Sequence, residues 1–592
     1  MILQALNEYY QRKRDVDPSS MPPPGMEFVE ISFAVVLRKD GTFFDLADLR
    51  EGEGRSKRGK IVIAFQGCDR TGQNAWATAF LLWDHPRYVF GMRTPKDCKD
   101  DDTPSKRLAS FKARILKSFP DPAIDEGVDA VFRFIAQDDF SMVEQHRLWA
   151  ELLETTGNVS FRLTDDPESF ICEYPVVIAA AEKELDDDSG YEKRQCLITG
   201  DISPIAVLHS ATPLPSRDSK STAKLVSFQK NSGYDSYGKE QGGNAPIGKR
   251  AVFAYTTALN HLLAKGSKQR IQVGDASTVF WAATPGHPME ELFPGFFGEP
   301  SKDNPDLGVG AVATLLNAPK TGAGSFEDDD TRFYVLGLAP NAARIAVRFW
   351  HVKTVGELAV NIRKHFDALS IAHAPHEPDT LSLFRLLVST ATLGKAENIP
   401  PNLSGDVMRS VIENLPYPQT LLSGAIRRIR AEQAKKDERT GKPIPNVSYP
   451  RAAIIKACIN RYSGKEELKV SLDENNTNTA YRLGRLFAVL ERIQERASPN
   501  LNATIRDRYY GAASSTPVTV FSTLLKLKNH HLAKLDNKGE AVNYEKLLGQ
   551  IMDGIADFPA HLDLQNQGRF AIGYYHQRQA FFTKSESTNK GE

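Results

Sequence analysis

The sequence predicts a multidomain α+β protein: mixed α/β N-terminal and middle regions followed by a C-terminal α-helical bundle. Short runs rich in β-branched and aromatic residues occur repeatedly up to about residue 380 and then fade. Beyond that point, apolar residues recur at helical spacing. The 592 residues are enough for several domains of roughly 100–200 residues each.

The N-terminal region is expected to begin with an amphipathic helix over 1–15 and to continue as a strand-rich sheet. A hairpin is predicted over 29–49, with Asp40-Gly41 as its turn. Further strands are expected over 60–65 and 79–91. Helices are expected over 105–119 and much of 123–157.

The middle region has strand and helix signals in alternation. Strands are predicted over 175–182, 193–210, 271–283 and 332–352, and helices over 251–266 and 354–369. From 380 onward all predicted elements are helical, at 380–391, 403–415, 418–436, 450–462, 477–497, 516–535 and 543–555. The predicted domains are 1–160, 161–375, 376–469 and 470–592.

The composition narrows the function classes. Charges balance at 74 basic against 74 acidic residues, which disfavours a uniformly basic nucleic-acid binder but allows local basic surfaces. The five cysteines lack the close spacing of a zinc site or a disulfide framework. The scattered cysteines indicate a reducing, cytoplasmic setting, and neither a signal peptide nor an apolar run of about 20 residues is predicted.

One segment resembles an enzyme motif. Residues 243–249 fit G-x4-G-K, the loop that cradles phosphates, but Arg250 stands where Ser or Thr would hold magnesium. Pro246 also removes a backbone N–H donor. An ATP-dependent nucleic-acid enzyme using residues 243–250 therefore remains an alternative. No catalytic set, metal site or cofactor is predicted, because neither H-E-x-x-H nor G-x-S-x-G occurs.

Basic residues gather on the C-terminal helices. In 477–497 the residues Leu483, Leu486, Leu490, Ile493 and Ala497 share one face, and arginines form a neighbouring stripe. Charge at helical spacing suits a phosphate backbone better than base edges. The alternative is a solubilising face.

Several segments occur in one order along the chain: MILQALNEYY, RTGQNAWATAFLLWDHPRYVFG, CLITGDISPIAVLH, SYGKEQGGNAP with AYTTALNHLL, LAPNAARIAVRFW, and YPRAAIIKACINRY with AYRLGRLFAVLERIQ. Together these ordered segments resemble the large subunit of the type I-C CRISPR surveillance complex, Cascade. The resemblance implies a non-catalytic subunit that reads the protospacer-adjacent motif in duplex DNA. It also implies that the subunit helps to open the duplex, holds the displaced strand and supports recruitment of a helicase-nuclease.

The resemblance also implies partners: the guide crRNA, double-stranded target DNA with its displaced strand, and the handle-binding, backbone and small subunits of Cascade. In the family the C-terminal part is also made separately as the small subunit. The matching block here begins near 470–478, where no Met occurs; Met408 and Met552 are the nearest. A purely architectural subunit without DNA contact remains a further alternative.

We predict three sets of nucleic-acid contacts. The motif-reading loop comprises Arg70, Thr71, Gly72, Gln73 and Asn74, because Asn and Gln can bond groove acceptors and Gly permits close approach. The phosphate-backbone set comprises Lys57, Arg58, Lys60, Lys239, Gln241, Asn244 and Lys249. The displaced-strand set comprises Arg427, Arg428, Arg430, Arg482, Arg485, Arg492, Arg496, Arg506, Arg508, Lys526 and Lys528.

Overall fold

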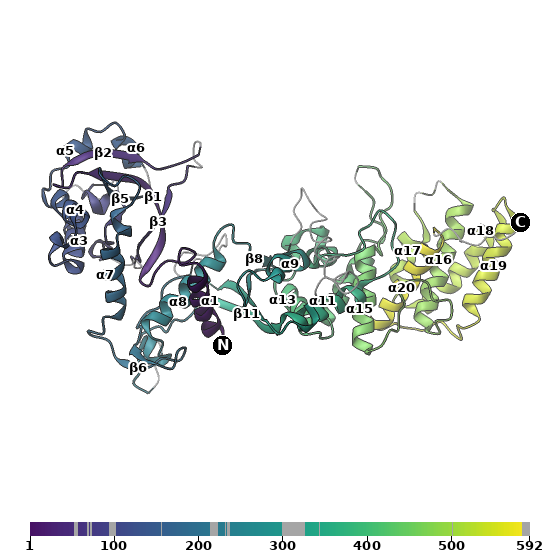
Figure 1. Ribbon diagram of the computed structural model, residues 1–592. Coiled ribbons are helices and arrows are strands. Elements are labelled where there is room, and N and C mark those ends of the chain that lie inside the picture. The colour runs from purple at the N-terminus through teal and green to yellow at the C-terminus, as the bar shows by residue number, and fades with distance from the viewer. Residues whose placement is uncertain are drawn as a thin grey trace, which may run out of the picture. The chain divides into compact units, whose positions relative to one another are not determined.

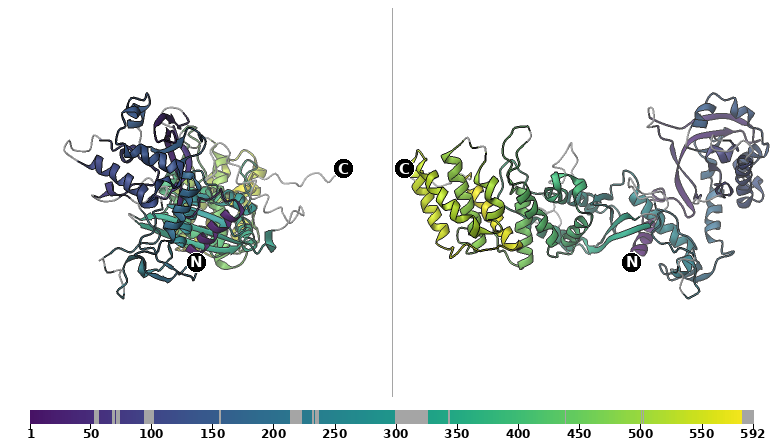
Figure 2. Two further views of the ribbon diagram at one scale, coloured as in Figure 1. Left: turned by 60° about the vertical axis from the view of Figure 1, so that its left-hand side comes forward. Right: turned by 180° about the vertical axis from the view of Figure 1, so that it is seen from behind.

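The computed structural model (Figures 1 and 2) divides the chain into two compact units. Unit 1 comprises Met1–Ser267 with Pro340–Ala346, and unit 2 comprises Lys268–Ala339 with Val347–Glu592. The four predicted domains remain a prediction. The residues described are 1–52, 57–67, 70, 74–93, 102–154, 157–212, 223–230, 233, 237–298, 326–341, 344–437, 439–499, 501 and 503–582.

Unit 1 contains a five-stranded sheet. Its strands are β1 (Met26–Leu37), β2 (Phe43–Asp48), β3 (Lys60–Phe65), β4 (Trp83–Asp84) and β5 (Asn158–Leu163), in the order β2-β1-β5-β4, with β3 also paired to β1. The predicted hairpin is confirmed, because β1 and β2 are antiparallel and Gly41 in their turn has φ +85°. β5 runs parallel to β1, and its register pairs Val35 with Phe161.

Helices cover this sheet and extend unit 1. α3 (Thr103–Ser118) and α4 (Glu126–Ala136) bury Phe111 and Phe134 near Phe161, at centroid distances of 6.3 and 6.4 Å. α1 (Ile2–Val16) confirms the predicted N-terminal helix and packs along α8 (Lys249–Leu263), as Figures 1 and 2 show. The remaining short elements are α5 (Ser141–Glu144), α6 (Trp149–Glu154), β6 (Lys193–Gln195) and β7 (Ile202–Pro204).

Two strand predictions in unit 1 are wrong. Residues 175–182 form the start of α7 (Pro175–Asp186), in which Pro175 occupies the first turn and the alanines favour helix over strand. Residues 79–91 form only the two-residue β4 and then α2 (Pro86–Val89), whose N-cap is His85. In both segments a continuous apolar run was compatible with either structure, and proline decided where the helix begins.

Unit 2 begins with a second sheet of four strands. They are β8 (Arg270–Val273), β9 (Ala276–Ala282), β10 (Arg332–Asn341) and β11 (Arg344–Thr354), in the order β11-β10-β9-β8. These strands confirm the predictions over 271–283 and 332–352. α9 (Pro288–Phe297) packs on one face, where Phe293 lies 4.6 Å from Phe280 and 5.3 Å from Phe333 between ring centroids. α11 (Val355–Leu369) begins with a capping box made by Thr354 and Glu357.

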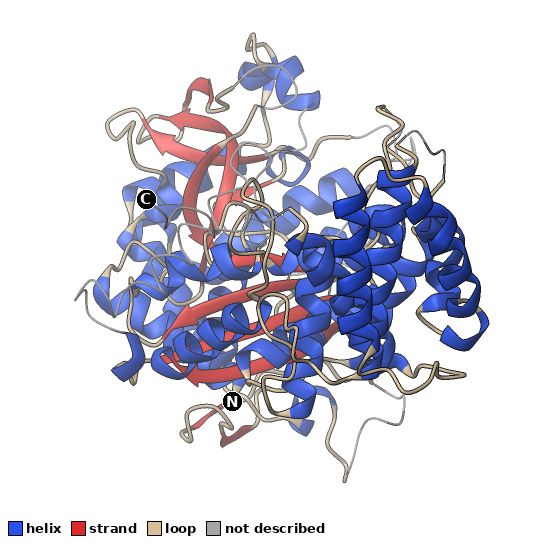
Figure 3. Cartoon of the chain, turned by 90° about the vertical axis from the view of Figure 1, so that its right-hand side faces the viewer, coloured by secondary structure: helices blue, strands red, loops and turns tan. Residues whose placement is uncertain are grey.

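The rest of unit 2 is helical, as predicted. These helices are among those drawn in blue in Figure 3: α12 (Leu383–Thr390), α13 (Pro401–Ile412), α14 (Gln419–Ala431), α15 (Tyr449–Ser463), α16 (Thr479–Ala497), α17 (Ile505–Ala513), α18 (Phe521–Ala533), α19 (Lys538–Met552) and α20 (Leu564–Ala580). The predicted apolar face of 477–497 is confirmed, since Leu483, Leu486, Leu490 and Ile493 are buried.

Helices α16 and α20 pack closely, and two glycines allow their approach. A Cβ atom on Gly484 would lie 2.0 Å from the Phe570 carbonyl oxygen, and one on Gly573 would lie 2.0 Å from that of Tyr481. α20 also packs on α15, where a Cβ on Gly568 would lie 2.9 Å from Ile459. The apolar core is therefore continuous across residue 470, where a separate C-terminal block was predicted to begin.

Candidate nucleic-acid interface

The first predicted residue of the motif-reading loop, Arg70, is held at the base of that loop. Its guanidinium carbon lies 3.7 Å from the ring centroid of Phe80 and 3.9 Å from that of Tyr88. Its Nε donates to the Thr78 carbonyl at 2.7 Å, and its terminal nitrogen pairs with the Asp84 carboxylate. Stacking on two rings and a charge-assisted bond to Asp84 hold this guanidinium at the base of the loop. Arg70 therefore anchors the base of the loop, and its predicted contact with the motif remains a prediction.

Asp84 is the centre of this anchor, and its side chain is fully buried. Its carboxylate accepts backbone N–H bonds from Phe80 at 2.9 Å and from His85 at 2.6 Å, besides the Arg70 bond. Burial raises the pKa of Asp84, while Arg70 and these N–H groups oppose that rise. The carboxylate thereby joins the two ends of the loop, at residue 70 and at residues 78–85.

Asn74 lies at the C-terminal end of the loop, where its side chain is exposed. It precedes a single 3-10 turn, η2 (Ala75–Ala77). The hydroxyl of Tyr88, whose ring stacks on Arg70, donates to the Ala75 carbonyl at 2.8 Å. Asn74 is therefore an exposed amide on a fixed backbone. Thr71, Gly72 and Gln73 lie outside the described residues.

A second carboxyl group supports the N-terminal end of the loop. Glu27 on β1 accepts the Gly67 N–H at 2.7 Å, and burial raises the pKa of Glu27 to about 7. The Trp83 indole donates to the Phe65 carbonyl at 2.9 Å and so ties β3 to β4. Sequence reasoning missed Glu27 and Asp84. A lone acid inside the apolar run FLLWDHPRYVF is the signal that could have indicated a partner for Arg70.

The area around η2 and α2 carries further positive charge. His85 has its pKa lowered to about 4, first by burial and then by the nearby Arg87, Arg70 and Arg107. Its neutral ring accepts the Arg87 N–H at Nδ1, at 3.2 Å. Lys106 of α3 lies 5.5 Å from the Trp76 ring centroid. Trp76 thus packs at the base of the loop beside a cation, next to Asn74.

Lys57, Arg58 and Lys60 lie at the other end of β3. All three are exposed, and Arg58 forms an ion pair with Glu30 at 3.6 Å. β3 has six residues, so at about 3.3 Å per residue these cations lie roughly 20 Å along the strand from the loop. The structure therefore separates these three cations from the motif-reading loop. A duplex that touched both would have to span about six base pairs at 3.4 Å each.

The 239–249 segment is organised by its own hydrogen bonds. Asn244 donates to the carbonyls of Lys239 at 3.2 Å and of Gln241 at 3.1 Å. Lys249 donates to the carbonyls of Glu184 at 3.2 Å and Asp187 at 2.8 Å, and Arg250 pairs with Asp186. Lys239 alone of the predicted side chains here is exposed. A phosphate-cradling loop needs its lysine directed at the ligand, so this geometry does not match one.

The displaced-strand set separates into buried and exposed members. Arg485 is 3% exposed, and it donates to the Gln577 side chain at 3.0 Å and to the Glu474 carbonyl at 3.2 Å. Arg506 is 4% exposed and pairs with Asp507 at 3.1 Å. These two arginines are interior residues, so the prediction that they face a nucleic acid is wrong. The helical spacing of 477–497 placed Arg485 next to the apolar face, and in the structure α20 covers that side of α16.

Five further members are engaged within the protein. Arg482 donates to the Asn476 carbonyl at 2.8 Å. The other four pair with glutamates: Arg428 with Glu432 at 2.6 Å, Arg492 with Glu495 at 3.5 Å, Arg496 with Glu540 at 2.8 Å and Lys528 with Glu545 at 3.9 Å. The remaining four are exposed and have no side-chain bond within the described part of the chain: Arg427, Arg430, Arg508 and Lys526.

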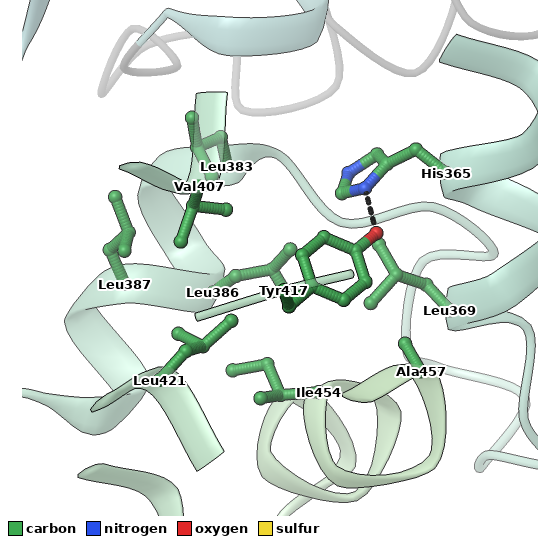
Figure 4. A pocket seen from close by; sticks show the side chains of 10 residues that line it. All are labelled: His365, Leu369, Leu383, Leu386, Leu387, Val407, Tyr417, Leu421, Ile454 and Ala457. Carbon is green, nitrogen blue, oxygen red and sulfur yellow. Dashed lines mark hydrogen bonds between the residues drawn. The ribbon is translucent and has the colours of Figure 1, made fainter. Parts of the chain in front are cut away.

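An internal cavity in unit 2 offers no ligand site. Figure 4 shows its lining, in which the His365 ring faces the Tyr417 hydroxyl at 2.6 Å among leucines. Its volume is about 10 Å³, which is no more than one water occupies. Burial lowers the pKa of His365 to about 3, so the ring is neutral.

No cluster of three or more His, Cys, Asp or Glu side chains within the described ranges could hold a metal ion. None of the helices described is both long and apolar enough to cross a membrane.

The chain is a CRISPR-associated protein. The sequence profile of the family described as CRISPR-associated protein (Cas_Csd1) matches residues 6–582. The chain therefore belongs to this family, the large subunit of type I-C Cascade, and the resemblance found in the sequence is confirmed. It is thus a subunit of a Cascade complex that contains other components. No curated protein matches the chain significantly.

Proposed function

We propose that this Cascade subunit reads the protospacer-adjacent motif in duplex DNA with residues 71–74, held on the Arg70–Asp84 stem. It is non-catalytic, helps to open the duplex, holds the displaced strand and supports recruitment of a helicase-nuclease. Its partners are the guide crRNA, the handle-binding, backbone and small subunits, and target DNA, in the cytoplasm. Target sequence would be read by RNA–DNA pairing, which leaves the protein only a short duplex motif to recognise.

The observation that carries this proposal is the construction of the stem. A buried carboxylate, a stacked guanidinium and a tyrosine hydroxyl fix both ends of a short polar loop. Fixed geometry is what base readout requires, because an amide discriminates a base edge only when its donor and acceptor are held in place. Asn74 presents such an amide on the surface.

The proposal is tested with assembled complexes and two targets, one a motif-bearing duplex and one already opened beside the motif. Gln73→Ala with Asn74→Ala should weaken binding of the duplex at least ten-fold, since a good amide–base pair contributes about 1–3 kcal/mol. Binding of the pre-opened target should change little. Asn543→Ala with Gln550→Ala, two exposed amides on α19, is the matched control. Equal loss on both targets would contradict a reading role and favour an architectural one.

A further inference from the structure

A groove lies between the end of α14 and the end of α17, wholly within unit 2. We call it the α14–α17 groove; its volume is about 580 Å³, and it is lined by Arg427, Arg430, Ala431, Gln433, Gly511, Ala512, Ser515 and Thr516. The lining contains two cations and no acidic residue.

Gln433 fixes the two walls of the groove relative to each other. Its side-chain oxygen accepts the Gly511 N–H at 2.8 Å, and its side-chain nitrogen donates to the Asp507 carbonyl at 3.0 Å. The α17 wall consists of small residues, and the Ser515 hydroxyl donates to the Gly511 carbonyl at 2.8 Å. A ligand can therefore approach the backbone of α17 closely while the arginines reach it from α14.

Acidic residues near the groove are bound to other arginines. Glu432 pairs with Arg428 and Arg451, and Asp507 pairs with Arg506. Arg427 and Arg430 are exposed and have no such partner within the described residues. Arg508 is exposed as well, and it lies three and four residues before Gly511 and Ala512, on the same helix face. The groove and its rim thus combine hydroxyl groups with three guanidinium groups that have no acidic partner in the part of the chain that is described.

We propose that the α14–α17 groove binds the phosphodiester backbone of a single-stranded nucleic acid. Guanidinium groups bind phosphate oxygens in bidentate fashion, and the absence of aromatic residues from the lining leaves no stacking platform for bases. A volume of about 580 Å³ falls in the range of small-ligand pockets, so a few nucleotides fit and a duplex does not. The identification of this strand as the displaced one rests on the proposed function.

The groove also depends on two parts of the chain. Arg427 and Arg430 come from α14, before residue 470, whereas Gly511–Thr516 come from the C-terminal block. A separately made C-terminal product beginning near 470 would lack both groove arginines. The site is therefore a property of the full-length subunit.

The test uses the isolated full-length chain and a fluorescent (dT)20 oligonucleotide, with anisotropy measured over a range of KCl concentrations. In Arg427→Gln with Arg430→Gln, the slope of log K against log[KCl] should fall by about 1.4, since each lost single-strand phosphate contact contributes about 0.7. Affinity at low salt should fall at least ten-fold. Arg147→Gln with Arg385→Gln, which are exposed arginines outside the groove, should leave both quantities unchanged.

An unchanged slope in the groove variant, or no binding by the wild-type chain at low salt, would overturn the proposal. Effective competition by a polyglutamate peptide of equal charge would overturn it too, because the groove would then serve an acidic protein. Failure of the proposed function is distinguishable. In that case wild-type complexes would bind duplex targets with and without the motif equally well. The (dT)20 titration would still show whether the groove binds single strands.

Discussion

The loop stem of unit 1 and the arginine-rich helices of unit 2 use the same side chain in opposite ways. In the stem, Arg70 is partly buried, stacked on two rings and ion-paired with the buried Asp84, and the nearby Asn74 is exposed. On the helices, Arg485 and Arg506 are interior residues, while Arg427, Arg430 and Arg508 are exposed and have no side-chain partner among the residues described. Arginine count along a sequence therefore locates positive charge, but the partners of each guanidinium decide whether that charge is available to a ligand.

The largest effect is expected from removing the partner of Arg70. Asp84→Ala removes the fully buried carboxylate from a partly exposed guanidinium that is stacked between two rings, and breaking a buried pair costs about 3–5 kcal/mol. The free energy of unfolding of unit 1 should fall by that amount, and the midpoint of its urea transition should move to a lower urea concentration. Asp84→Asn, which keeps an acceptor for the backbone N–H groups, should cost less. Equal stability of Asp84→Ala and wild type would show that Arg70 is not an anchor.

A smaller effect is expected in unit 2. Arg485→Ala should destabilise unit 2 by about 1.5–3 kcal/mol, because it removes two buried bonds made by a charged group. Its affinity for (dT)20 should stay at the wild-type value. Arg427→Gln with Arg430→Gln should show the reverse pattern of unchanged unfolding and weaker binding. If Arg485→Ala weakened binding without loss of stability, the division into interior and exposed arginines would be wrong.

The smallest effect concerns pH and the N-terminal end of the loop. The pKa of Glu27 is raised from 4.5 to about 7, so the folded chain binds this proton more tightly than the unfolded chain. Its contribution to stability is present below about pH 4.5 and is lost as pH rises through about 7. Glu27→Gln should therefore stabilise unit 1 relative to wild type by about 3 kcal/mol at pH 8 and by about 1 kcal/mol at pH 5.5, at about 1.36 kcal/mol per pKa unit.

Urea unfolding of both proteins at the two pH values measures this difference. A constant difference between wild type and Glu27→Gln would mean that the carboxyl group does not titrate in this range.

Periodic patterns predicted most of the fold. The hairpin at Asp40-Gly41, the strands of the second sheet and the helices after residue 380 follow from patterns of two and 3.6 residues. The strand predictions over 175–182 and 79–91 were wrong, because an uninterrupted apolar run shows neither the two-residue period of a strand nor the 3.6-residue period of a helix. The exposure of Asn74 agrees with the predicted loop. The burial of Arg485 could not be predicted, because it depends on α20, about 90 residues later in the chain.

The most direct measurement of motif reading is photocrosslinking from the motif itself. Assembled complexes would be bound to duplex DNA carrying 4-thiothymidine at each motif position in turn, and the crosslinked peptides would be identified by mass spectrometry. If the loop reads the motif, crosslinks should fall within residues 70–77, and the yield should drop in Gln73→Ala with Asn74→Ala. Crosslinks confined to residues 239–249, or their absence from unit 1, would contradict that assignment.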